Sequence, residues 1–327
     1  MVSLKKCNMI NNNFDRNITF LIQGSIDNNF LINEVIKSVR KFYPNSTVLL
    51  STWESSNYKN LNYDQIVLSR DTDLTYKFYS DSNIINNINR QIITTKNGLN
   101  QVRTKYVVKI RSDIILTSSS LLDSFKNLKK ISLFGLKNQI ILPIDLSRNP
   151  SKMKMLFHFN DWLIAGVTPD IKKIFDIPLM SLVDLKFFNN SLESKEIYTF
   201  KNWINNNFVM QTLKNSMIPR HCPEQYLFKF LIPNYKRFFN NAYSYNEYLL
   251  KSHKIFLDLC IFPIFYKNIF INIKHPLKFY SERTVNYTKA DVLSKQNSVF
   301  LPTFDFLYYF FKFISFLKLL LYKFLLK

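Results

Sequence analysis

The sequence predicts an α/β protein with an open, mostly parallel sheet flanked by helices. Three observations predict this class: short β-branched and aromatic segments recur along the first part of the chain, apolar residues at helical spacing separate them, and polar clusters follow them. The chain has 327 residues, 47% of them hydrophobic, so it can bury a sizeable core and differs from a mainly disordered protein.

The first strand and the first helix have the clearest patterns. Ile18–Gln23 is β-branched and aromatic and stops at Gly24, which predicts a strand followed by a loop. Apolar residues from Leu31 to Phe42 then recur at helical spacing, which predicts a helix. Pro44 ends that helix, because proline cannot continue it.

Three more strands and a second helix are predicted before residue 111. Residues 47–51, 65–69 and 106–110 carry the same strand pattern, and a long polar helix is predicted over about residues 83–98. The resulting β-α-β-β-α-β alternation favours parallel pairing, because parallel strands need crossover connections.

The rest of the chain has a less regular pattern. The predicted elements are a helix near residues 119–128, strands near 131–134, 139–142 and 162–167, a helix after Thr168 and a helix that opens at Pro223. The chain shows no internal repeat and no long Gly/Ser linker. We therefore expect one main domain over residues 15–250, a basic extension over 251–303 and an amphipathic helix over 304–327.

Polar clusters follow the four predicted strands. They are Gln23-Gly24-Ser25, Ser51-Thr52-Trp53, Arg70-Asp71 and Arg111-Ser112-Asp113. Because open parallel sheets bind ligands at the carboxyl ends of their strands, these clusters should meet at one edge of the sheet. That edge is the predicted site.

Lys109, Arg111 and Asp113 should share one face of the fourth strand, because side chains alternate along a strand. Asp113 would lie nearest the ligand-binding end, where a carboxylate can hold a divalent cation and an adjacent guanidinium can pair with phosphate. The alternative is a local ion pair between Arg111 and Asp113 with no further role. The neighbouring clusters favour the functional interpretation.

The net charge of +21 favours anionic partners, such as nucleic acid, phosphorylated ligands or an acidic membrane surface. No helix-turn-helix, zinc-finger or RNA-recognition signature accompanies this charge, so no nucleic-acid partner is expected. Cys7, Cys222 and Cys260 are too widely spaced for a disulfide framework or a zinc motif, which fits a reducing compartment. No secretory apolar stretch follows Met1, so a cytoplasmic protein is expected.

Several short motifs occur together in a fixed order. They are Gln23-Gly24-Ser25-Ile26, Ser51-Thr52-Trp53, Asn89-Arg90-Gln91 with Gly98-Leu99, residues 105–113, Asp161-Trp162 with Gly166, and Pro223-Glu224-Gln225. In this order the chain resembles the WavE lipopolysaccharide synthesis family over about residues 18–230. The resemblance implies a bacterial glycosyltransferase with a GT-A-like nucleotide-diphospho-sugar transferase fold, which acts in lipopolysaccharide, O-antigen or capsule assembly. The resemblance does not define the donor, and we expect a UDP-sugar.

A donor-binding site follows from these motifs. The expected donor-binding residues are Gln23, Gly24, Ser25, Trp53, Asp71, Arg90, Lys109, Arg111 and Asp113. Trp53 and Asp71 are expected near the base and ribose, although Trp53 fits a core or rim aromatic equally well. Gly24 would allow close approach of the diphosphate.

The resemblance leaves the role of a metal open. GT-A enzymes usually carry an Asp-x-Asp motif that binds a metal and the donor diphosphate, and here Arg111 stands in place of the first acid. Either Asp113 alone holds Mg²⁺ or Mn²⁺ against the diphosphate, or Lys109, Arg111 and Arg90 neutralise the leaving nucleotide without a metal. The metal mechanism is slightly preferred.

Asp161 and Glu224 are the candidate catalytic carboxylates. Transfer with inversion needs a base that takes the proton of the acceptor hydroxyl, whereas transfer with retention needs no such base. Each residue also has a structural interpretation, since Asp161 can cap a turn and Glu224 can stabilise the start of a helix.

The C-terminal segment is expected to bind a membrane surface. Its charged residues Asp305, Lys312, Lys323 and Lys327 fall in one sector of a helical wheel, Lys318 lies outside that sector, and apolar side chains fill most of the rest. Such a helix lies in the interface of an anionic membrane, although packing on the core is the alternative. We therefore expect a peripheral protein on the cytoplasmic face of the bacterial inner membrane, acting on a lipid-linked or oligosaccharide acceptor. Two other functions compete with this one: a basic nucleic-acid-binding protein and a non-catalytic partner in a polysaccharide assembly complex.

Overall fold

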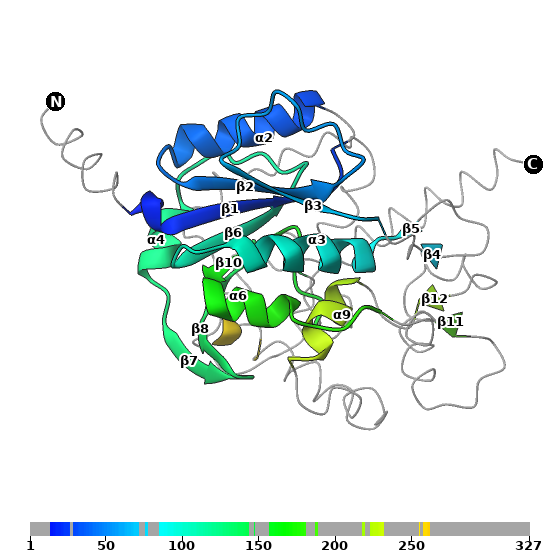
Figure 1. Ribbon diagram of the computed structural model, residues 1–327. Coiled ribbons are helices and arrows are strands. Elements are labelled where there is room, and N and C mark those ends of the chain that lie inside the picture. The colour runs from blue at the N-terminus through cyan, green and yellow to red at the C-terminus, as the bar shows by residue number, and fades with distance from the viewer. Residues whose placement is uncertain are drawn as a thin grey trace, which may run out of the picture.

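A computed structural model gives the structure of the chain. It describes residues 14–26, 29–71, 76–77, 85–143, 147, 157–180, 187–188, 218–219, 223–231, 255 and 258–261. Within these residues, seven strands form one sheet in the order β13-β9-β10-β6-β1-β2-β3 (Figure 1). The strands are β1 (Ile18–Gln23), β2 (Thr47–Trp53), β3 (Gln65–Ser69), β6 (Tyr106–Arg111), β9 (Ile140–Ile141), β10 (Leu163–Val167) and β13 (Cys260–Ile261).

The sheet is mostly parallel. Strand β1 pairs in parallel with β2 and with β6, and β2 pairs in parallel with β3. Strand β10 runs antiparallel to both β6 and β9, whereas β13 is parallel to β9. The carboxyl ends of β1, β2, β3 and β6 therefore lie along the same edge of the sheet.

Helices cover both faces of the sheet (Figure 1). Helix α2 (Asn29–Phe42) and helix α4 (Leu121–Lys126) pack on one face through an apolar cluster that includes Val35, Val39 and Phe125. Helices α3 (Ile88–Gln101), α6 (Thr168–Phe175) and α9 (Pro223–Lys229) pack on the other face through a cluster that includes Ile92 and Ile171. Because both faces are covered, every residue of β1 is buried.

Three short strand pairs and one turn of 3-10 helix complete the described elements. The pairs are β4 (Tyr76–Lys77) with β5 (Ile85–Asn86), β7 (Lys130–Leu133) with β8 (Leu136–Asn138), and β11 (Phe187–Phe188) with β12 (Ile218–Pro219). The 3-10 turn η1 (Asp15–Asn17) precedes β1. Among the described helices, none has the length and apolar character needed to cross a membrane.

The predicted α/β class, with its mostly parallel sheet between helices, is confirmed. The predicted helix over residues 83–98 is wrong at its start, because Ile85–Asn86 forms β5 and α3 begins at Ile88. Strand β5 pairs with β4, a contact between segments that no local pattern encodes. The prediction also lacks strand β8. This strand follows β7 after a tight turn at Phe134 and Gly135, which both have positive φ.

The predicted C-terminal segments lie almost wholly outside the described residues. The amphipathic helix over residues 304–327 is not described, and of the extension over 251–303 only residues 255 and 258–261 are. Within that extension, Cys260–Ile261 forms β13 and joins the main sheet beside β9. This part of the extension therefore packs with the main domain.

Candidate functional site

A cavity of about 530 Å³ lies at the carboxyl edge of the parallel strands. Its lining includes nine of the predicted site residues: Gln23, Gly24, Ser25, Trp53, Arg90, Arg111, Asp113, Asp161 and Glu224. These residues come from the ends of β1, β2 and β6, from the first turns of α3 and α9, and from the segment before β10. Chain segments that are far apart in the sequence thus meet around one cavity. Of the predicted residues, only Asp71 and Lys109 do not line it.

Gly24 allows the loop after β1 to approach the end of β6. Its φ is 134°, and a Cβ at this position would lie 2.8 Å from the Oγ of Ser112. Ser112 joins the two segments, because its N–H donates to the carbonyl of Gln23 at 2.9 Å and its hydroxyl donates to the carbonyl of Ser25 at 2.8 Å. The position therefore requires glycine both for its backbone conformation and for space.

Helix α3 is fixed on the sheet by two buried hydrogen bonds. The side-chain amide of Gln23 donates to the hydroxyl of Thr94 at 2.9 Å, and the hydroxyl of Ser51 donates to the carbonyl of Thr94 at 2.6 Å. Further along the helix, Gly98 lies so close to the sheet that a Cβ would overlap Leu21 and lie 3.0 Å from the Cβ of Ser51. These contacts place the first turns of α3 at the cavity.

Arg90 forms part of the cavity wall together with Trp53. Its guanidinium lies over the Trp53 ring, 5.1 Å from the ring centre, and its Nη2 donates to Asp71. The Nε of Arg90 is buried and has no hydrogen-bond partner among the described residues. Asp71, which does not line the cavity, thus orients a side chain that does.

Arg111 and Asp113 form the ion pair that the sequence offered as the alternative to a metal ligand. The Nε of Arg111 donates to Oδ1 of Asp113 at 2.9 Å, and its Nη2 donates to Oδ2 at 2.5 Å. The guanidinium also lies over the Trp162 ring, 4.9 Å from the ring centre. Burial opposes the charge of Arg111, but the neighbouring Asp113 raises the pKa of Arg111 above its ordinary value, so it stays a cation.

The residues around Asp113 do not fit a divalent cation. Both of its carboxylate oxygens already accept hydrogen bonds from Arg111, and a dication there would lie beside the guanidinium charge. No group of three or more His, Cys, Asp or Glu in the part of the chain that the structure describes could hold a metal ion. Mg²⁺ or Mn²⁺ at Asp113 stays a prediction that this donor set does not favour.

Lys109 lies beneath the cavity and not in its wall. Its side chain is fully buried in the middle of β6 and donates to the backbone carbonyl of Asp161. Burial lowers the pKa of Lys109 to about 8, and the negative charge of Asp161 opposes this effect. A buried amine that holds the Asp161 backbone cannot also contact a ligand in the cavity, so Lys109 supports the site from below.

Asp161 and Glu224 place two carboxylates at the same cavity. Asp161 is 7% exposed, and burial together with the charge of Glu224 raises its pKa, while Lys109 and Arg111 oppose the shift. Its Oδ1 is buried without a hydrogen-bond partner among the described residues. Glu224, in the first turn of α9, has its Oε2 3.5 Å from the Nε2 of His158.

Three residues near the site have no role in the sequence-based prediction. Gln91 donates to the carbonyl of Asp161 at 3.4 Å, Trp162 stacks on Arg111, and His158 faces Glu224. Gln91 and Trp162 are sequence neighbours of predicted residues, so adjacency could have pointed to them. The contact between His158 and Glu224 joins segments more than sixty residues apart and has no local signal.

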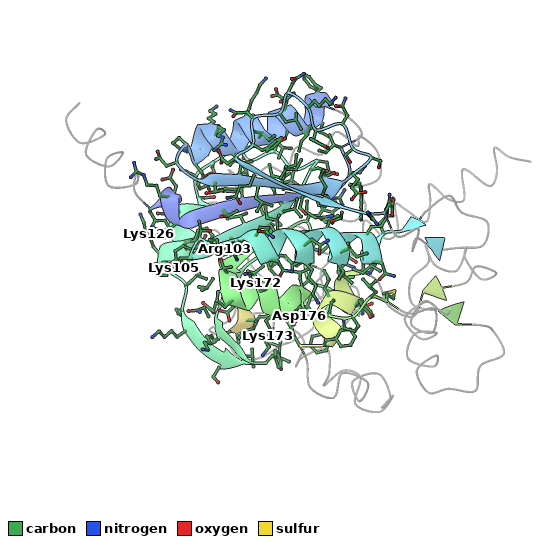
Figure 2. All side chains as sticks on the ribbon, viewed as in Figure 1. Arg103, Lys105, Lys126, Lys172, Lys173 and Asp176 are labelled. Atoms are coloured by element: carbon green, nitrogen blue, oxygen red, sulfur yellow. The ribbon has the colours of Figure 1, made fainter. Side chains whose placement is uncertain are left out.

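Several basic side chains of the described residues lie away from the cavity. Figure 2 labels several basic side chains around the turn before β6, the end of α4 and α6, namely Arg103, Lys105, Lys126, Lys172 and Lys173. Lys105 directly precedes β6, so it lies at the edge of the sheet opposite Arg111. The acidic residue labelled there, Asp176, forms an ion pair with Lys96 at 2.6 Å. The net charge of the chain is therefore not a property of the cavity alone.

Comparison with known proteins identifies one family. A family model described as WavE lipopolysaccharide synthesis matches residues 18–298, and no curated protein matches the chain. Similar solved structures include the bifunctional IspDF from Campylobacter jejuni, which shares 15% sequence identity with this chain. The match covers 50% of this chain and 44% of IspDF, with a TM-score of 0.30.

Two glycosyltransferases are also similar. The galactosyltransferase LgtC, in complex with donor and acceptor sugar analogues, shares 12% identity over 65% of this chain and 69% of its own, with a TM-score of 0.32. The mannosyltransferase PcManGT from Pyrobaculum calidifontis, in complex with GDP-Man and Mn²⁺, shares 11% identity over 73% of this chain and 74% of its own, with a TM-score of 0.32. TM-scores this low carry no information about activity, and the chain spans less than half of IspDF.

Proposed function

The chain belongs to the WavE lipopolysaccharide synthesis family, and from this we propose that it is a glycosyltransferase, which moves a sugar from a nucleotide-activated donor to a surface glycan under assembly. One observation carries the proposal: the cavity at the carboxyl edge of the sheet combines the side chains of Arg90 and Arg111 with two carboxylates, that of Asp161, which is buried, and that of Glu224, which is partly exposed. Arginines suit the diphosphate of a donor, and carboxylates suit proton transfer from an acceptor hydroxyl.

The donor is proposed to lie between α3 and the end of β6. Among the described residues that line the cavity, Arg90 and Arg111 are the cationic side chains, and we propose that they bind the diphosphate. The cavity volume of about 530 Å³ lies within the range of about 300–1,000 Å³ that is usual for small-molecule sites. Gly24 exposes backbone where a side chain would otherwise fill the space. A UDP-linked sugar is the proposed donor.

Asp161 is the proposed base if the transfer proceeds with inversion. A general base works best when its pKa lies near the working pH, and burial raises the pKa of Asp161 toward that range. Lys109 holds the Asp161 backbone from below, and Gln91 donates to the same carbonyl, so the segment is fixed on two sides. Glu224 would then raise the pKa of Asp161 through its negative charge. His158 is the neighbour of Glu224.

The acceptor is proposed to be a lipid-linked or oligosaccharide intermediate of lipopolysaccharide, O-antigen or capsule. The protein would work at the cytoplasmic face of the inner membrane and bind anionic lipid through residues 304–327. Deletion of residues 304–327 should move the chain to the soluble fraction of a lysate without changing donor binding. Unchanged sedimentation with membranes would contradict this attachment.

A thermal-shift screen of nucleotide sugars tests the proposed function directly. One nucleotide sugar should raise the Tm of the wild type, since a ligand that binds only the folded state stabilises it. Arg90→Gln should reduce that shift, whereas the matched control Arg103→Gln, at the opposite edge of the sheet, should keep it. The proposal fails if no nucleotide sugar stabilises the wild type, or if both variants lose the shift equally.

A further inference from the structure

We propose that Arg111 supplies the positive charge at the donor diphosphate that a divalent cation supplies in other nucleotide-sugar transferases, and that Asp113 positions Arg111 and does not bind a metal. This inference rests on the proposed function and concerns how that site handles charge. It follows from the contacts of the Arg111–Asp113 pair and from the neighbouring ring of Trp162.

Arg111 occupies both carboxylate oxygens of Asp113 with hydrogen bonds, so a metal would have to compete with the guanidinium for them. The Nε and Nη2 of Arg111 each donate to a different carboxylate oxygen, in the two-pronged geometry that guanidinium and carboxylate groups favour. Without Arg111, the Asp113 carboxylate would repel an incoming diphosphate. In the pair, its oxygens are turned toward the guanidinium, and the N–H donors of Arg111 that Asp113 does not use are the groups that a diphosphate would meet.

The same geometry leaves part of Arg111 available to a ligand. Its third nitrogen, Nη1, makes no hydrogen bond among the described residues, and Arg111 lines the cavity. A guanidinium offers five N–H donors, so two bonds to Asp113 leave donors for phosphate oxygens. Arg111 can therefore bind Asp113 and a phosphate at the same time.

Arg111 is held in place before any ligand binds. Its backbone N–H donates to the carbonyl of Trp162 at 3.1 Å, its guanidinium lies over the Trp162 ring, and its Nε and Nη2 donate to Asp113. Strand β6 fixes its backbone, since Gln23 of β1 is its register partner. A cation fixed in advance stabilises developing charge without reorganising when the reaction occurs.

The charge that Arg111 would stabilise appears on the leaving nucleotide. In the transfer, the bond between the anomeric carbon and the diphosphate oxygen breaks, and a bond from the acceptor oxygen to that carbon forms. The acceptor proton passes to a carboxylate base, and the nucleoside diphosphate leaves with the electron pair and one additional negative charge. Arg111, with Arg90 as the second cation at the cavity, faces this leaving group.

Titration calorimetry with UDP as the probe tests the inference on the full chain. The wild type should bind UDP in the presence of EDTA, and replacing EDTA with MnCl₂ should change the affinity by less than about threefold. Arg111→Met should weaken binding by about 10- to 100-fold, as expected for loss of a charged hydrogen-bond donor. Arg111→Lys should recover only part of this loss, because lysine lacks the planar fork.

Asp113→Asn separates a positioning residue from a metal ligand. If Asp113 only positions Arg111, the variant should weaken UDP binding less than Arg111→Met does and should show no new response to Mn²⁺. The Tm of each variant without UDP shows whether it is folded, and Arg103→Gln serves as the matched control at the opposite edge.

The outcomes distinguish the inference from the proposed function. UDP binding that requires Mn²⁺, and that Asp113→Asn abolishes, would overturn the inference and leave the proposed function intact. UDP binding in EDTA that is unchanged in Arg111→Met would also overturn it. If neither UDP nor any nucleotide sugar binds the wild type with or without Mn²⁺, the proposed function fails, and the inference fails with it.

Discussion

Replacing Lys109 with methionine should remove a pH dependence of stability that this buried amine gives the wild type. Lys109 is fully buried in β6 and donates to the carbonyl oxygen of Asp161. Burial lowers its pKa from the ordinary 10.5 to about 8, and the charge of Asp161 opposes that change. The folded state therefore releases the Lys109 proton at a lower pH than the unfolded state does.

Proton linkage gives the sign and the size of the effect. Well below pH 8, Lys109 is protonated in both states and adds no pH dependence. Between about pH 8 and pH 10.5 the unfolded state binds more protons, so the free energy of unfolding rises with pH. This interval spans about 2.5 pH units, and at about 1.4 kcal/mol per unit the gain is about 3–4 kcal/mol.

Urea unfolding of both chains between about pH 7 and pH 10.5 measures this gain. Subtracting the free energy of unfolding of Lys109→Met from that of the wild type at each pH cancels the titrations that both chains share. These include the titrations of Tyr43 and Cys260, whose pKa values burial raises. The difference in unfolding free energy should change by about 3–4 kcal/mol in favour of the wild type as the pH rises. A constant difference over the whole range would refute the reasoning, because Lys109 would then titrate alike in the folded and unfolded states.

Three other substitutions test the geometry of the site. Gly24→Ala should lower the free energy of unfolding by about 1–3 kcal/mol in urea unfolding, because the backbone has a positive φ and a Cβ would crowd the Ser112 hydroxyl; a stability equal to that of the wild type would contradict this loop geometry. Gly98→Ala should destabilise by about 1–2 kcal/mol although alanine favours helices, since a Cβ would overlap Leu21, and an increase in Tm would mean that α3 packs less closely on the sheet. Asp161→Asn should slow sugar transfer by about 100- to 10,000-fold with donor affinity nearly unchanged, and the wild-type rate should fall as the pH decreases through the raised pKa of Asp161. A rate that stays constant down to the ordinary pKa range of aspartate would exclude Asp161 as the base.

Local patterns in the sequence predicted the framework of the sheet. Ile18–Gln23 and Gln65–Ser69 have the bounds that the structure gives to β1 and β3, because uninterrupted β-branched runs end at polar residues or glycine. The convergence of polar clusters was also predictable, since parallel strands place their carboxyl ends at one edge of the sheet. The cavity lies at that edge, between Gln23, Trp53 and Arg111.

Contacts between distant segments could not be predicted in the same way. The alternation along β6 placed Lys109 on the face of Arg111, but only packing shows that this face is covered at Lys109 and open at Arg111. The pairing of Asp71 with Arg90 depends on how the segment after β3 meets α3. Such contacts arise from the tertiary packing of whole elements, and no local spacing encodes them.

The departure from an Asp-x-Asp motif was visible in the sequence, but its consequence was not. Arg111 and Asp113 are two residues apart on a strand, so an ion pair and a metal site were both compatible with that spacing. The two hydrogen bonds between them decide how the carboxylate is used in the folded chain. Trp162, whose ring lies against the guanidinium, comes from a segment about fifty residues away in sequence.

A crystal structure of the chain with the nucleotide sugar that stabilises it most is the most direct test of the central claim. The diphosphate should lie in the cavity, within hydrogen-bond distance of Arg90 and Arg111, with the sugar toward Asp161. A nucleotide sugar bound instead at the opposite edge of the sheet, near Arg103 and Lys105, would contradict the account.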